Sequence, residues 1–140
     1  MSTQPPAIVV TYVEHDVLRI EARGHVTFAD QPLDDGGDDT APTPTELFVS
    51  SLGACVAFYA ERFLRRHGLP TEGLQVTCSY RWAENPHRVG EIELEVVAPG
   101  LTDARREAFV RVIDHCTVHN TLRGQPAVTL KLASSKVATA

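Results

Sequence analysis

The sequence predicts a single α+β domain with a mostly antiparallel sheet and two main helices. Three observations support this class: β-rich segments follow one another through short turns, one long segment carries complete helix start and stop signals, and neither a glycine-rich phosphate loop nor a parallel βαβ repeat occurs. The expected order is β-β-β-α-β-β-α-β. Because 140 residues is the usual length of one domain, we expect one domain over 1–140, with flexible ends at 1–6 and 134–140.

The first thirty residues are typical of short antiparallel strands. We expect strands over 7–13 and 17–23, joined as a hairpin, and a third short strand over 24–30. The next segment is rich in Pro, Gly and Asp, and its DDGGDD stretch predicts a solvated, mobile loop. A cation site is the alternative, but the regular ligand spacing that a calcium loop needs is absent.

A long central helix follows this loop. Thr43 is expected to be the N-cap, Pro44 the first helical residue, and Glu46 the residue that completes a reciprocal capping box. Gly68 is expected just beyond the C-terminal end, which predicts a helix of about 24 residues. Because 47–60 contains no charged residue, this helix must be buried on most sides, against a sheet and a partner element or subunit.

The second half of the chain predicts a hairpin, a helix and a last strand. The expected elements are strands at 74–82 and 91–98, a helix from Thr102 to about His115, a short helical turn within 116–122, and a strand at 127–133. In the hairpin, apolar residues alternate with polar ones. One face is therefore expected to be buried and the other wet.

Charge and composition exclude several classes of function. The net charge of −5 and the missing basic patch argue against nucleic acid and anionic membranes as partners. The N-terminal segment carries no charged region followed by a long apolar run, so we expect a cytoplasmic protein. No cofactor-binding motif is visible, and we expect the protein to bind no cofactor.

The three cysteines, Cys55, Cys78 and Cys116, are too few for a disulfide scaffold, and none forms a CxxC pair. Cys78 lies on the apolar face of a strand and is expected to be a core filler. Cys55 lies among small residues of the central helix. Cys116 comes at a helix end before polar residues that would expose its sulfur. Cys55 and Cys116 are therefore candidates for either packing or reactive thiols.

Two further arrangements of residues are conceivable around these cysteines. His115 and His119 could bind a metal with Cys116, but two histidines four residues apart occur often by chance. A hydrolase built on Cys55 and His119 would need a third orienting residue or an oxyanion motif, and neither is readable. No metal site is expected.

The segments PTPTELFVSSLGAC at 42–55 and CTVHNTL at 116–122, with a long helix that ends in a glycine, resemble the OsmC/Ohr family. The resemblance spans most of the chain. It implies a thiol peroxidase of the oxidative stress response that reduces organic hydroperoxides. It also implies an intertwined homodimer with the long helices in the centre and active sites at the subunit interface.

The resemblance also implies roles for particular residues. Cys55 would be the peroxidatic thiol and Cys116 the resolving thiol, and an external dithiol would be the reductant. Family peroxidases add an arginine from the N-terminal strands, for which Arg19 and Arg23 are both candidates. They also add a glutamate near the start of the central helix, for which Glu46 is the candidate.

Two positions depart from the family pattern. Thr45 occupies the usual glutamate position, one residue before Glu46, and Thr117 stands where many relatives have proline. An ideal helix puts Glu46 about 13 Å along the axis and roughly 180° around from Cys55. Either the partner subunit supplies this glutamate to the site, or Glu46 is only the capping-box residue.

An apolar pocket is expected around Cys55, with walls from Phe48, Leu52, Phe58 and Tyr59. Such a pocket suits an organic hydroperoxide, but it disfavours a thiolate, so a cation must offset the desolvation. The alternative function is a non-catalytic family member that binds a small apolar or thiol-containing ligand in the dimer-interface cavity.

Overall fold

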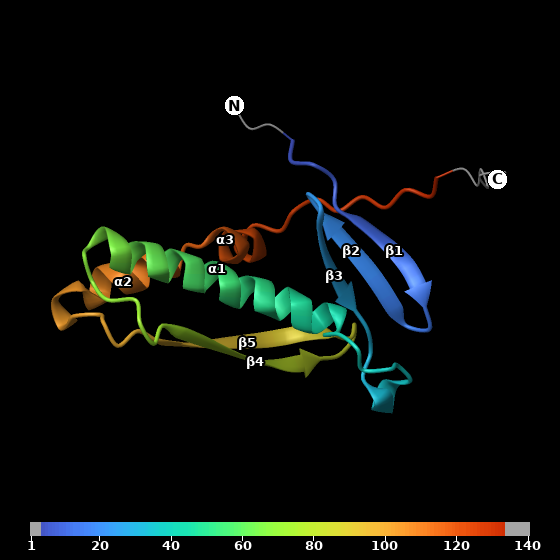
Figure 1. Cartoon of the computed structure of the whole chain (residues 1–140), viewed down its shortest axis with the longest axis horizontal. Coiled ribbons are helices and arrows are strands. Elements are labelled where there is room, and N and C mark those ends of the chain that lie inside the picture. The colour runs from blue at the N-terminus through green and yellow to red at the C-terminus, as the bar shows by residue number, and fades with distance from the viewer. Residues whose placement is uncertain (1–3, 134–140) are drawn as a thin grey trace.

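The computed structural model describes residues 4–133, and Figure 1 shows their arrangement. The predicted flexible C-terminal end at 134–140 lies outside this range. Residues 1–3 of the predicted flexible N-terminal end also lie outside it. One antiparallel sheet holds β1 (Val9–Glu14), β2 (Val17–Ala22) and β3 (His25–Ala29), and a second holds β4 (Gln75–Ala83) and β5 (Arg88–Val97). The helices are α1 (Pro44–Arg66), α2 (Arg106–Ile113) and α3 (Thr117–Arg123), with 3-10 turns η1 (Leu33–Asp35) and η2 (Asp103–Arg105). The predicted α+β class is confirmed.

The central helix begins and ends where its capping residues predict. The Glu46 amide donates to Thr43 Oγ1 at 3.1 Å, and the Thr43 amide donates to Glu46 Oε1 at 2.8 Å, which completes the capping box. At the other end Gly68 adopts the left-handed region with φ of 65°. There the Leu69 amide donates to the Leu64 carbonyl at 2.8 Å, as expected for a glycine-terminated helix.

α1 packs along the β4–β5 hairpin and also contacts α2 and α3. α1 and β4 approach closely at Gly53, where a methyl group would overlap the sulfur of Cys78. The glycine is therefore required by packing, although glycine disfavours helix. Cys78 is partly buried against this surface, in agreement with its predicted packing role.

The core consists of two clusters along α1. One contains Ala60, Phe63, Leu64 and Phe109, and the other contains Leu52, Val56 and Cys116. In the first cluster the rings of Phe63 and Phe109 meet edge to face, with centroids 5.3 Å apart. Phe109 is the buried residue of α2, so this contact attaches α2 to α1.

The charge-free stretch of α1 is covered on one side only within the chain. Phe48 and Phe58 remain 42% and 49% exposed. α1 is the one helix in the described part of the chain that is long and apolar enough to cross a membrane, but it packs on β4 and β5 as a core helix. Its remaining apolar surface is the part for which the sequence predicts a partner element or subunit.

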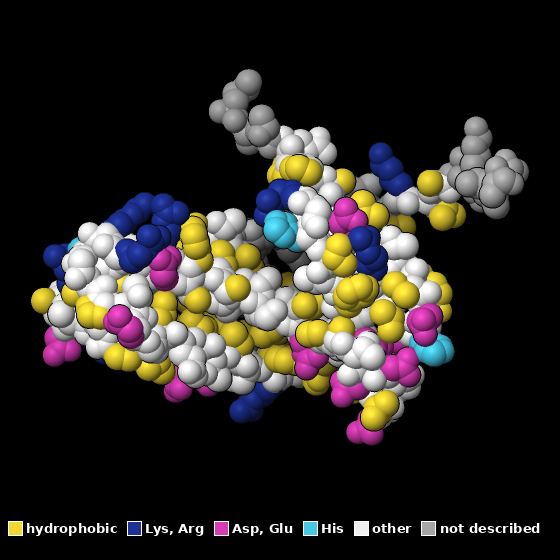
Figure 2. Space-filling view, viewed as in Figure 1, with side chains coloured by type: hydrophobic (Ala, Val, Ile, Leu, Met, Phe, Trp, Pro, Cys, Tyr) yellow, Lys and Arg dark blue, Asp and Glu magenta, His cyan; other side chains and the backbone are white. Residues whose placement is uncertain are grey.

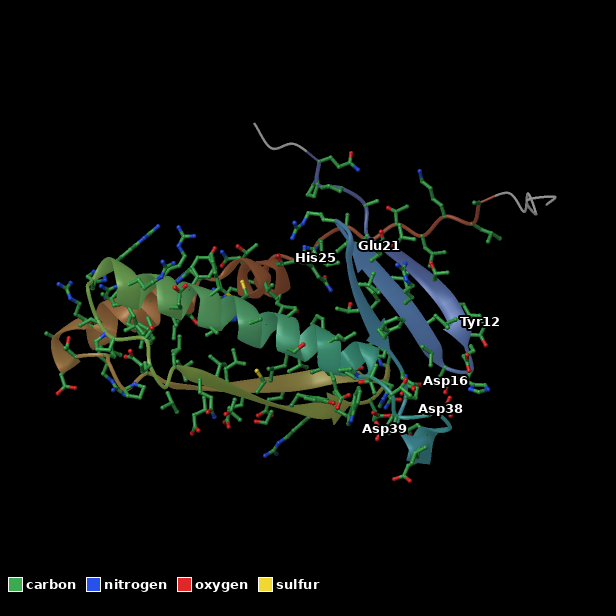
Figure 3. The ribbon with its side chains drawn as sticks, viewed as in Figure 1. Tyr12, Asp16, Glu21, His25, Asp38 and Asp39 are labelled. Carbon is green, nitrogen blue, oxygen red and sulfur yellow. The ribbon has the colours of Figure 1, made fainter. Side chains whose placement is uncertain are left out.

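The β1–β3 sheet stands apart from the layer formed by α1 and the β4–β5 hairpin (Figure 1). Apolar residues on its strands, including Val10, Tyr12 and Phe28, are exposed. Tyr12 lies on β1, well away from α1 in Figure 3. Hydrophobic side chains are accordingly visible over this part of the surface in Figure 2. A sheet that exposes this much apolar surface leaves an area for another chain to cover.

Two predicted elements differ from the structure. The helix expected from Thr102 starts as the η2 turn and becomes α-helical only at Arg106, and the Thr102 side chain makes no capping hydrogen bond. The strand predicted at 127–133 is wrong, since 125–133 has no regular structure. A strand needs a neighbour for its backbone groups, and the described part of this chain gives 127–133 none. Its alternating residues Val128, Leu130 and Leu132 are 88%, 92% and 96% exposed.

The acidic loop after β3 is solvated as predicted, but it is also held at both ends. Asp30 is buried, and its carboxylate accepts hydrogen bonds from the Gln31 amide at 2.7 Å and the Thr40 amide at 3.0 Å. The Thr40 hydroxyl donates to the same carboxylate at 2.6 Å. Figure 3 shows Asp38 and Asp39 near Asp16, at the end of the sheet that this loop adjoins.

Replacing Asp30 with asparagine should make the free energy of unfolding less dependent on pH in the acid range. The hydrogen bonds from the Thr40 hydroxyl and amide lower the pKa of Asp30 from 3.8 to about 2. A lowered pKa means that the ionised carboxylate stabilises the fold above pH 4, and that this contribution is lost as pH falls from 4 toward 2. Urea unfolding of wild type and Asp30→Asn should therefore differ most at pH 7, with a difference that shrinks below pH 4.

The exposed Asp34 in the same loop provides the matched control, Asp34→Asn. A wild-type advantage over Asp30→Asn that stays constant from pH 7 to pH 2 would contradict the role of the ionised carboxylate.

Candidate functional site

Cys55 and Cys116 lie together, although 61 positions separate them in the chain. Cys55, on α1, is partly buried and packs against the cluster of Leu52, Val56 and Cys116. Cys116 is 0% exposed, so the expectation of an exposed sulfur is wrong. The reason is that the segment between α2 and α3 packs against α1, with Ile113 and Val118 on either side of Cys116 contributing to this cluster.

Cys116 is also the N-cap of α3, where its sulfur accepts a hydrogen bond from the His119 amide at 3.4 Å. Burial raises the pKa of the Cys116 thiol, and its interaction with the Cys55 thiol raises that pKa further. The His119 amide acts in the opposite direction. Cys116 is thus held as a protonated thiol beside Cys55 at neutral pH.

A hydrogen bond between side chains links α1 to α3 next to the two thiols. The hydroxyls of Tyr59 and Thr117 lie 3.0 Å apart. Tyr59 is one turn after Cys55, and Thr117 directly follows Cys116. The sequence predicts Tyr59 only as part of the apolar wall around Cys55. It indicates Thr117 only as the residue that stands where many relatives have proline. The sequence carries no signal that these two hydroxyls meet.

The short helix α3 is fastened to the end of α2. Arg123 Nη2 lies 2.8 Å from Asp114 Oδ2, and Arg123 Nη1 donates to the Asp114 carbonyl at 2.8 Å. Asn120 Nδ2 donates to the His115 carbonyl at 3.2 Å. These contacts hold the middle and the end of α3 against the end of α2, with Cys116 between the two helices. The position of the Cys116 sulfur therefore depends on both helices.

Cys78 belongs to a different surface of α1. It meets the helix at Gly53, on the side that packs against β4. Cys55 is two residues further along, which is about 200° around an α-helix. Cys78 and Cys55 therefore lie on different sides of α1.

The other predicted site residues do not join Cys55 within this chain. Glu46 is engaged with the Thr43 amide in the capping box. Arg19 Nη1 forms an ion pair with Glu21 at 2.8 Å, and Arg23 occupies the turn after β2 with φ of 52°. The main packing partners of α1 among the described elements are β4, β5, α2 and α3. The strand that carries Arg19 is not one of them.

The predicted apolar wall around Cys55 is present in part. Leu52 and Tyr59 belong to the cluster around the two thiols, whereas Phe48 and Phe58 are about half exposed. The enclosure on the side of Phe48 and Phe58 is incomplete in a single chain.

This fold and site define a class: a small α+β domain in which a central helix and a following short helix hold two thiols side by side. Residues 36–131 match the family model described as OsmC-like protein. The chain therefore belongs to the OsmC-like protein family. No curated protein matches the sequence.

Solved structures with the same fold are distant in sequence. A proposed osmotic-stress-induced and detoxification-response protein from Psychrobacter arcticus is 22% identical, with a TM-score of 0.76 over 86% of this chain and 91% of that one. An OsmC-like protein from Mycoplasma pneumoniae is 20% identical, with a TM-score of 0.72 over 89% and 91%. An organic hydroperoxide resistance protein from Elizabethkingia anophelis is 20% identical, with a TM-score of 0.66 over 89% and 93%.

Proposed function

We propose that this protein is a thiol-dependent peroxidase that reduces organic hydroperoxides. The observation that carries the proposal is the packing of Cys55 against Cys116. A pair of neighbouring thiols in a reducing compartment suits reversible oxidation to a disulfide. The family assignment supports the same chemistry, since one structural relative is an organic hydroperoxide resistance protein.

The reaction would proceed in two steps on these sulfurs. The Cys55 thiolate attacks the O–O bond of ROOH, which leaves a sulfenic acid on Cys55 and releases RO⁻, which takes up a proton to become ROH. The Cys116 thiol then condenses with the sulfenic acid, forming a disulfide and releasing water. An external dithiol supplies the two electrons that restore both thiols.

The difference in burial between the two cysteines supports a different role for each. Cys116 is fully buried with a raised pKa, which disfavours its thiolate as the first nucleophile. Cys55 is partly exposed and borders the half-open apolar side of α1. Cys55 is therefore the better candidate for the group that meets the hydroperoxide, and Cys116 for the group that resolves it.

A homodimer would complete the site. The β1–β3 sheet, the Phe48 and Phe58 side of α1, and the alternating residues of 127–133 all expose apolar surface in one chain. A second copy could cover these surfaces and pair the backbone of 127–133. It could also bring Arg19 or Arg23 to Cys55, since the strand carrying Arg19 does not pack on its own α1.

The disulfide is the direct test of this proposal. Reduced protein treated with one equivalent of cumene hydroperoxide should contain a disulfide between Cys55 and Cys116, with Cys78 free, as read by mass spectrometry of nonreduced peptides. Three free thiols after the pulse would sink the peroxidase proposal and favour the non-catalytic ligand binder. A disulfide that includes Cys78 would contradict the assignment of Cys116.

The two arginines can be distinguished by the reactivity of Cys55. Arg19→Gln and Arg23→Gln each remove one cation, and loss of the assisting cation should slow alkylation of Cys55 by iodoacetamide at pH 7 by roughly an order of magnitude. Peptide mapping measures the rate at Cys55, and each variant is the control for the other. Wild-type rates in both variants would show that neither arginine assists the thiolate.

A further inference from the structure

One side-chain hydrogen bond connects α1 to α3, two helices that are described over their whole length and lie side by side (Figure 1). The hydroxyls of Tyr59 and Thr117 lie 3.0 Å apart, a distance at which either can donate to the other. Tyr59 follows Cys55 by four residues and shares its face of α1. Thr117 is the first residue of α3, directly after the N-cap Cys116. The bond therefore joins the two helices next to the two thiols.

The bond is made within one chain. Tyr59 packs on the cluster of Leu52, Val56 and Cys116, and this packing leaves its side chain partly buried. The neighbouring Phe58 is 49% exposed, on the side of α1 that a second copy could cover. Because successive residues of an α-helix point about 100° apart, Tyr59 points away from that side and toward α3. The hydrogen bond therefore forms without a second copy.

The other side-chain contacts of α3 do not provide a polar connection to α1. Arg123 and Asn120 form their hydrogen bonds with the end of α2. Against α1, the segment offers only the apolar packing of Cys116 and Val118. The Tyr59 hydroxyl is thus the polar group of α1 that holds the start of α3 in place. If this bond is lost, apolar packing alone keeps the Cys116 sulfur in the cluster.

We propose that Tyr59 and Thr117 are positioning residues, whose hydrogen bond keeps the Cys116 thiol beside Cys55 and inaccessible to small disulfides in solution. Cys116 is 0% exposed, so a molecule from solution reaches its sulfur only when the start of α3 opens from α1. An open Cys116 thiolate exchanges with a small disulfide RSSR by forming a bond to one sulfur and displacing RS⁻. A docked Cys116 has only Cys55 as its neighbouring thiol.

The benefit of this positioning rests on the proposed peroxidase function, in which Cys116 resolves the oxidised Cys55. The opening of α3 does not rest on it. The experiment therefore measures opening without peroxide, in the Cys55→Ser protein, where no second thiol competes beside Cys116. Iodoacetamide labels Cys116 in proportion to the open population when opening and closing are fast, and peptide mapping reads the rate.

Tyr59→Phe and Thr117→Val each remove one hydroxyl and nearly preserve the shape of the side chain. Each should raise the labelling rate of Cys116 about fivefold, which is the effect expected from the net loss of one hydrogen bond. The double variant should also label about fivefold faster, because both substitutions remove the same bond. Thr117→Ser keeps a hydroxyl and should retain the slow rate.

Thr121→Val is the matched control, because the Thr121 hydroxyl donates to the Thr117 carbonyl at 2.9 Å within α3 and does not reach α1. It should leave the labelling of Cys116 unchanged. Cys78 is the internal control in every sample. It packs at Gly53, so a general loss of stability would speed the labelling of both cysteines, whereas opening of α3 speeds that of Cys116 alone.

Unchanged labelling of Cys116 in Tyr59→Phe and Thr117→Val would overturn the proposal, and so would an equal rise in Thr121→Val or at Cys78. Effects that multiply in the double variant would contradict a shared bond, and fast labelling in Thr117→Ser would contradict the role of the hydroxyl. If Cys116 is labelled as expected but cumene hydroperoxide leaves the wild-type thiols unchanged, the positioning proposal stands and the peroxidase proposal fails.

Discussion

Replacing Cys55 with serine is expected to reduce the turnover of cumene hydroperoxide to the uncatalysed rate. A thiolate is the nucleophile for the O–O bond, and a serine hydroxyl remains protonated and far less nucleophilic at neutral pH. Cys55 is the less buried of the two packed thiols, so no other sulfur takes its place at the apolar opening. Steady-state consumption of hydroperoxide with a dithiol reductant provides the measurement.

Cys116→Ser should separate the two half-reactions. The first equivalent of hydroperoxide should still be consumed in a single turnover, because Cys55 is intact. The sulfenic acid should then persist long enough to be trapped by dimedone, since no neighbouring thiol condenses with it. Continuous turnover should fall accordingly.

Cys78→Ser is the matched control for both variants, since Cys78 packs at Gly53, about 200° around α1 from Cys55. Its turnover should equal that of wild type. Residual wild-type turnover in Cys55→Ser would remove Cys55 from the mechanism. Equal losses in Cys78→Ser and Cys116→Ser would show that the effect is structural.

The second large effect is expected from Phe109→Ala, which should lower the free energy of unfolding by about 3–5 kcal/mol. Phe109 is 3% exposed and packs edge to face on Phe63, and it is the buried residue by which α2 is attached to α1. Removing the ring leaves a cavity between the two helices that the short α2 cannot fill. Urea unfolding measures the loss.

The same change should loosen the thiol site. The contacts between Asp114 and Arg123 tie α3 to the end of α2, so a displaced α2 exposes Cys116. Iodoacetamide should then label Cys116 in folded Phe109→Ala faster than in wild type.

Val110→Ala is the control from the same helix, because Val110 is half exposed. It should change stability by no more than about 0.5 kcal/mol. Similar losses in the two variants, or unchanged labelling of Cys116, would contradict the role of Phe109 as the anchor.

The local signals that predicted the fold are those that act within a few residues. The capping box of Thr43 and Glu46 and the glycine at position 68 predicted both ends of α1, because these contacts form within one helical turn. The alternation over 74–82 and 91–98 predicted the β4–β5 hairpin for the same reason. Segment 127–133 shows the limit of this reasoning, since alternation indicates a face to bury but not a neighbour to pair with.

The candidate site was predicted less completely. The sequence indicated Cys55 and Cys116 as the cysteines to consider, and the structure brings their side chains into one cluster. It did not indicate that Cys116 is the buried one, nor that Tyr59 and Thr117 join beside the pair. These facts depend on how α3 docks on α1, which involves residues about sixty positions apart.

The sequence by itself determined most of the elements, both ends of α1 and the family resemblance, because capping, turns and periodicity are properties of neighbouring residues. Only the tertiary structure decided which thiol is buried, which side of α1 stays open, and that Cys78 and Cys55 lie on different sides of α1. Burial and contact between distant segments follow from the packing of whole elements. Because successive residues of an α-helix point about 100° apart, residues that are close in the sequence of α1 have different surroundings.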